Sequence, residues 1–206
     1  MKTTLIAALA AALALGGCAS QTPTREVSVA YVIYDIQPGA DVSAGRIAEA
    51  VKTALQRNTT SVRITNAIPP SPLPDAAPRF QLVSPFKGGL AALAAANGAQ
   101  VQVPTCEGAI LSANAADTSM RKYSESTTFF VCVMPYKGGY AMDIYTTFSK
   151  ASGGFSPQAL GAALAHSVVG DSSQFIPRTI ASIVTEVQQT GATVKMTDAY
   201  PTEPGK

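Results

Sequence analysis

The sequence has few of the residues from which catalytic and metal sites are built. It holds one histidine, His166, three cysteines, and only 14% charged residues among 206 positions. A metal site needs more ligands than one histidine and a few scattered carboxylates. The cysteines lack a C-x-x-C spacing, and neither G-x-S-x-G nor G-x-x-x-x-G-K-[ST] occurs. We therefore expect no metal, no cofactor and no recognisable catalytic residues.

Charge of either sign is also scarce, and it is not clustered. The chain has 15 basic and 13 acidic residues, which gives a formal net charge of +2. Nucleic-acid binding depends on a concentrated basic patch, so no nucleic-acid partner is expected. After residue 17 no apolar run approaches the roughly 20 residues that span a bilayer.

What the chain does have is a clear N-terminal motif. Lys2 is followed by an uninterrupted apolar run over residues 5–15, then by Gly16, Gly17 and Cys18. A positive start, an apolar stretch of about 7–15 residues and small residues before a cleavage point are typical of a secretory signal peptide.

Leu15-Gly16-Gly17-Cys18 resembles the lipobox of bacterial lipoproteins, in which signal peptidase II cuts before the cysteine and its thiol carries a diacylglycerol. The resemblance implies that residues 1–17 are the signal, Cys18 the lipidation site, and residues 18–26 a short polar tether. The residue after the cysteine is not the aspartate of an inner-membrane retention signal, which implies the periplasmic face of the outer membrane. The alternative is an ordinary signal peptide, cleaved near Ala19-Ser20, with a stray cysteine.

Two cysteines remain for the folded domain, Cys106 and Cys132. In an oxidising compartment such a pair predicts a structural disulfide. Closing a loop of about 27 residues is worth roughly 3–4 kcal/mol in the chain-entropy model. The alternative, a redox or metal pair, lacks the C-x-x-C spacing and a nearby histidine.

The first half of the domain predicts a strand over residues 27–36 and a helix capped by Ser43 that ends near Asn58. A second strand is expected over 61–68. The helix has apolar positions at i, i+3, i+4 spacing, which predicts its buried face: Ile47, Ala50, Val51, Ala54 and Leu55.

Residues 69–85 contain six prolines, which excludes a central strand or a helix interior. The segment is expected to be extended, either as a loop that braces the domain edge or as a partner-docking strip. A short helix over 90–97 and a strand over 99–112, interrupted near Pro104 and Gly108, should follow. Residues 113–126 are interpreted as a polar connection.

Residues 127–150 predict a β-hairpin with a three-residue loop, Lys137-Gly138-Gly139. That loop pairs Tyr136 with Tyr140. It also gathers one apolar set on a single face of the hairpin: Phe130, Cys132, Met134, Met142, Ile144 and Phe148.

The C-terminal part predicts a helix over 156–169, a second helix from Pro177, a short strand over 194–196 and a flexible tail over 198–206. The second helix places one apolar set on a single face: Ile180, Ile183, Val184 and Val187. The predicted fold class is α/β, in the α+β arrangement. A single mixed sheet with a β-hairpin in its C-terminal half is flanked by about four helices over residues 27–197.

His166 is the one residue that would support catalysis, with Asp171 and Ser167 or Ser172 as partners. Neighbouring helix positions do not face one another, so a structural histidine is favoured. Residues 171–173 are interpreted as a linker and helix cap. The aromatic residues near the hairpin are interpreted as core or sheet-face positions: Tyr136, Tyr140, Tyr145 and Phe155.

The order of elements, with "LAALAAANGAQVQV" before the hairpin, resembles the amino-terminal domain of TolB and the lipoproteins of curli secretion and penicillin-binding-protein activation. That resemblance implies binding to other envelope proteins, or ring assembly, with no catalysis. We therefore expect a binding or assembly factor for cell-envelope components. A lipid-anchored periplasmic hydrolase and an oligomeric secretion component, the latter a homo-oligomer, are the alternatives.

Overall fold

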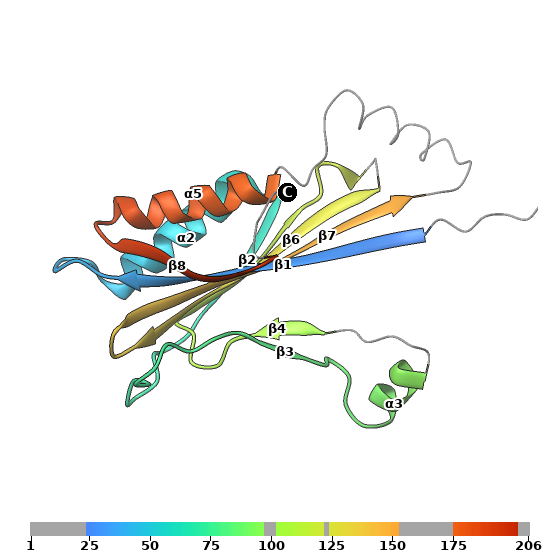
Figure 1. Ribbon diagram of the computed structural model, residues 1–206, viewed down its shortest axis with the longest axis horizontal. Helices are drawn as coiled ribbons and strands as arrows, with labels where there is room; N and C mark the ends of the chain where they lie inside the picture. Colours follow the sequence, from blue (N-terminus) through green and yellow to red (C-terminus); the bar gives the residue numbers. More distant parts are fainter. Residues whose placement is uncertain (1–23, 97–101, 122–123, 153–174, 202–206) are drawn as a thin grey trace, which may run out of the picture.

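The computed structural model describes residues 24–96, 102–121, 124–152 and 175–201 (Figure 1). Its main sheet has six strands in the spatial order β2-β5-β6-β7-β1-β8: β1 (Thr24–Gln37), β2 (Ser61–Asn66), β5 (Leu111–Asp117), β6 (Glu125–Tyr136), β7 (Gly139–Ser152) and β8 (Thr193–Tyr200). Strands β3 (Gln81–Val83) and β4 (Val103–Thr105) pair in a separate ribbon. The helices of the described part are α2 (Ala44–Asn58), α3 (Gly89–Ala96) and α5 (Phe175–Gln189).

The α+β class agrees with the sequence prediction, but the prediction of a mixed sheet is wrong. Every pairing between described strands is antiparallel. Strands β5, β6 and β7 follow one another as a meander, and such short connections permit only antiparallel neighbours. The helix expected over 156–169 lies outside the described residues.

Helices α2 and α5 cover one face of the sheet, here called the helix face (Figure 1). The N-cap of α2 is Ser43, whose hydroxyl accepts a hydrogen bond from the Arg46 N–H, as predicted. All five apolar residues predicted for the inner face of α2 are buried. On α5, Ile183 and Val187 are buried, and the other predicted apolar residues, Ile180 and Val184, pack against this core.

The predicted hairpin exists, but its register is wrong by one residue. Tyr136 pairs with Gly139, so Lys137 and Gly138 alone form the loop. The slip divides the predicted apolar face, because neighbouring strand residues point to opposite sides. Val131, Val133, Met142 and Ile144 belong to the core of the helix face, whereas Cys132 and Met134 belong to a smaller cluster.

Gly139 explains this register. Its φ of +145° lies in the region that favours glycine, and a Cβ there would collide with the carbonyl oxygen of Ile36 on β1. The hairpin therefore turns at a position where β1 passes too close for a side chain. That contact cannot be seen in the sequence of the hairpin alone.

The boundaries of four strands also differ from the predictions. The stretch interpreted as a polar connection carries most of β5 and the start of β6, because Ala113 and Ala115 are buried. Strand β1 begins at Thr24, inside the expected tether. Strand β8 continues to Tyr200, inside the expected tail, and pairs with β1.

The proline-rich segment crosses the opposite face of the sheet, here called the strap face (Figure 1). We define residues 67–80 as the strap. The Lys137 N–H at the hairpin tip donates a hydrogen bond to the Pro74 carbonyl over 2.9 Å, and Lys137 also pairs with Asp75. The predicted cysteine pair lies nearby, with 1.98 Å between the sulfurs of Cys106 and Cys132. The strap therefore forms a second layer on this face.

None of the helices that the structure describes is long and apolar enough to cross a membrane.

Candidate functional site

An open groove of about 910 Å³ lies between the start of α2 and the start of the strap. Ala44 and Ala48 of α2 form one wall, and Ile64 near the end of β2 forms part of its base. Further lining residues come from the strap and the hairpin: Ile68, Pro69, Pro70, Leu73, Pro135 and Tyr140. The groove has a mainly apolar lining, the usual character of a binding site.

The charges at the rim of this groove neutralise one another. Lys52 donates to the Glu49 carboxylate over 3.0 Å, and both side chains are well exposed. In contrast, Ile68 at the mouth is 89% exposed, which is unusual for so large an apolar side chain. The site therefore suits an uncharged, apolar ligand better than an ionic one.

The groove also adjoins an open edge of the sheet. Among the described strands, β2 pairs with β5 alone and ends the sheet. An edge strand presents backbone N–H and C=O groups to which an extended peptide can add as a further strand. A peptide bound there would place alternate side chains beside the apolar walls.

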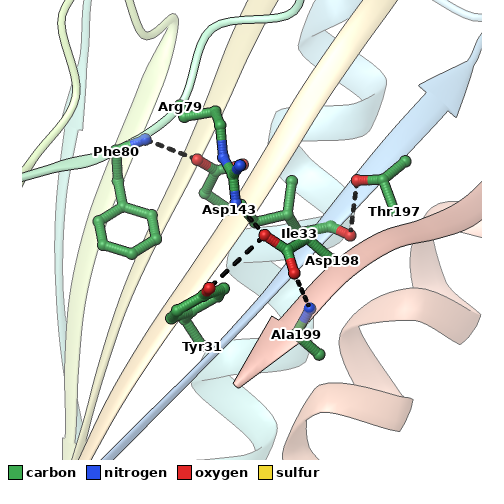
Figure 2. Close-up of polar contacts among 8 residues, drawn as sticks. All are labelled: Tyr31, Ile33, Arg79, Phe80, Asp143, Thr197, Asp198 and Ala199. Carbon is green, nitrogen blue, oxygen red and sulfur yellow. Dashed lines mark hydrogen bonds and ion pairs between the residues drawn. The ribbon is translucent and has the colours of Figure 1, made fainter. Parts of the chain in front are cut away.

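A second site lies on the strap face, where Asp143 of β7 is 1% exposed (Figure 2). Its Oδ2 accepts a hydrogen bond of 2.6 Å from the Phe80 N–H of the strap. Within the described residues, Oδ1 accepts no hydrogen bond. Burial raises the pKa of Asp143 to about 6, against the opposing effects of the Phe80 hydrogen bond and the Arg79 charge.

Arg79 turns toward a second carboxylate, that of Asp198 on β8 (Figure 2). Asp198 also accepts a hydrogen bond from the Tyr31 hydroxyl at 3.5 Å and one from the Ala199 N–H at 2.8 Å. The hydrogen bond from Arg79 is the main reason that the pKa of Asp198 is lowered.

Aromatic rings pack against one another beside Asp143, Arg79 and Asp198. Phe80 contacts Tyr31 edge-on at a ring separation of 5.5 Å, and Tyr145 at 5.6 Å. Tyr200 stacks on Tyr31 at 6.0 Å. Both strap residues, Arg79 and Phe80, are thus held by strands β1, β7 and β8. We interpret this cluster as the set of contacts that holds the strap against the sheet. It contains one carboxyl group, that of Asp143, whose pKa of about 6 lets it titrate near neutral pH.

The structure describes some of the residues that the sequence analysis singled out, and others lie outside the described part. Of the aromatic residues, Tyr145 is buried, Tyr140 is half-buried against the core, and the Tyr136 hydroxyl donates to Asp35 over 2.6 Å. These are core and sheet-face positions, as predicted. The predicted lipidation site Cys18, the catalytic candidate His166 and its partners, and Phe155 lie outside the described residues.

Sequence reasoning missed Asp143, Arg79 and Asp198. A signal for Asp143 was present, because it is the only charged residue in the otherwise apolar and hydroxylic strand segment YAMDIYTTF. Arg79 had no such signal, since its partners come from strands distant in sequence. In the part of the chain that the structure describes, no three His, Cys, Asp or Glu residues are grouped so as to hold a metal ion.

The sequence matches no protein-family model, and it has no significant match among curated proteins.

Proposed function

We propose that this protein is an outer-membrane lipoprotein, anchored through Cys18, that binds a segment of another cell-envelope component in the groove beside α2. The observation that carries the proposal is the apolar groove of about 910 Å³ next to β2, which is an edge strand among the strands that the structure describes. Apolar walls provide binding energy, and the strand edge provides backbone hydrogen bonds to an extended chain.

The position of the groove also suits this role. The start of α2, the start of the strap and the hairpin tip gather at one end of the longest axis, and the start of β1 points to the other end (Figure 1). An anchor attached through the N-terminal tether would therefore leave the groove on the side away from the membrane. A partner in the periplasm would reach it without competition from the bilayer.

The hydrolase alternative depends on His166, outside the described residues, and draws no support from the structure. Asp143 has the raised pKa of a catalytic acid, but Phe80 and its neighbours occupy its surroundings. The binding proposal therefore accounts for more of the described molecule.

Site-specific photocrosslinking in intact cells tests this function. A photoreactive amino acid at Ile68, at the groove mouth, should give a defined adduct, whereas one at Met196 on β8, 53% exposed, should not. A second change, Ala48→Trp, should abolish the Ile68 adduct because the indole fills the groove. An Ile68 adduct that survives Ala48→Trp, or equal adducts from both positions, would contradict the assignment of the groove.

A further inference from the structure

Helix α3 is apolar and well exposed. Its eight residues, GLAALAAA, include no charged or polar side chain. Leu90 is 66% exposed and Leu93 is 60% exposed. A surface helix of a soluble domain normally turns charged and polar residues outward. The side chains of Leu90 and Leu93 therefore give α3 an apolar surface that is exposed to its surroundings.

The chain around α3 is similarly poor in charge. From residue 80 to residue 105 the only charged side chain is Lys87, which lies just before the helix. The ribbon that leads to and from α3 also exposes Leu82, Val83 and Val103. A segment of this kind, which is apolar and has a single positive charge, suits the interface of a bilayer. Anionic headgroups attract a lysine there, and acyl chains accept leucine.

The place of α3 in the molecule favours a membrane over a protein partner. Helix α3 stands apart from the main sheet, and it lies toward the same end of the longest axis as the start of β1 (Figure 1). Five residues lie between Cys18 and Thr24, and the six residue steps from Cys18 to Thr24 span at most about 20 Å when the chain is extended. An acyl anchor on Cys18 would therefore bring this end of the domain against the bilayer.

We propose that α3 inserts into the lipid surface, with Leu90 and Leu93 among the acyl chains just below the headgroups and Lys87 beside the headgroup phosphates. The inference rests on the proposed lipid anchor, which supplies the proximity. Once the anchor is in place, insertion is effectively intramolecular, so even a small apolar helix can remain bound. The contact would orient the domain, with the groove directed into the periplasm.

The absence of tryptophan from the chain permits a direct test. The lipidated mature protein carrying Leu90→Trp is reconstituted into phosphatidylethanolamine and phosphatidylglycerol vesicles. We expect a blue shift of its emission, and loss of most of that emission when the acyl chains are brominated. Met196→Trp, a similarly exposed position on β8, should show neither effect.

A second variant distinguishes insertion of α3 into the bilayer from a position of α3 merely near the bilayer surface. Leu93→Asp, added to Leu90→Trp, should restore the emission in brominated vesicles, because a carboxylate is costly below the headgroups. A Leu90→Trp protein that is lipidated and vesicle-bound but unquenched would overturn the insertion of α3 and leave the anchor intact. Absence of acyl chains by mass spectrometry would instead overturn the anchor, and with it the proximity on which the inference rests.

Discussion

The Asp143 carboxylate of β7 accepts a hydrogen bond of 2.6 Å from the backbone N–H of Phe80, a residue 63 positions earlier in the chain. This contact joins the centre of the strap face to the strap. The hydrogen bond between Lys137 and Pro74 fixes the same segment at the hairpin tip. A proline-rich stretch that could have been a loose loop is therefore an ordered second layer.

Stability should depend on pH through Asp143. Burial raises its pKa to about 6 in the folded protein, above the value of 3.8 for an exposed aspartate. The folded state thus holds a proton that the unfolded state releases between these values, so stability falls as the pH rises through about 6. One pKa unit corresponds to about 1.4 kcal/mol, so this group accounts for roughly 3 kcal/mol between about pH 4 and pH 7.

Asp143→Asn should remove that dependence, because the amide oxygen can still accept from Phe80 and does not titrate in this range. Urea unfolding of both proteins from pH 4.5 to pH 8 measures the difference. Asp198→Asn is a matched control, since Arg79 lowers the pKa of Asp198 and its contribution is lost only as the pH falls below about 4. Parallel curves for Asp143→Asn and the natural protein would contradict the prediction.

Loss of the disulfide should lower the stability of the folded protein. Cys132 lies in the small cluster of the strap face with Met134 and Ala141, and Cys106 follows β4. The Cys106→Ser, Cys132→Ala variant should lose roughly 3–4 kcal/mol by the chain-entropy estimate, with a lower Tm by calorimetry. Thiol titration of the denatured, unreduced natural protein should find neither cysteine reactive. Two reactive thiols there would exclude the bridge.

Gly139 should tolerate no side chain. A Cβ would collide with the Ile36 carbonyl oxygen, and the φ of +145° is strained for any L residue. We expect Gly139→Ala to cost about 1–3 kcal/mol, measured by urea unfolding. Gly89→Ala is the matched control: a Cβ there meets nothing within 4 Å, and alanine favours the first turn of α3. Equal effects of the two changes would show that the approach of β1 does not fix the turn.

The parts of the fold that follow local patterns could be predicted from the sequence. The inner face of α2 follows from its 3.6-residue period, and Ser43 marks its start. The hairpin register could not, because it depends on where β1 approaches Gly139. The candidate sites were harder still to predict from the sequence. The groove is built from α2, β2, the strap and the hairpin, and Arg79 pairs with Asp198 on a strand distant in sequence. No periodicity encodes such contacts.

The lipid anchor is a prediction of the sequence alone, and Cys18→Ala tests it. The thiol is the proposed acyl acceptor, so the variant should incorporate no clickable fatty acid, remain uncleaved by signal peptidase II, and keep the apolar run of residues 5–15. The natural protein should be labelled and should sediment with outer membranes. Cys106→Ser is the control, because it removes a cysteine without changing the motif at Leu15-Gly16-Gly17-Cys18. Labelling that persists in Cys18→Ala would exclude the anchor, and the domain would then have to find its partner without being held at a membrane.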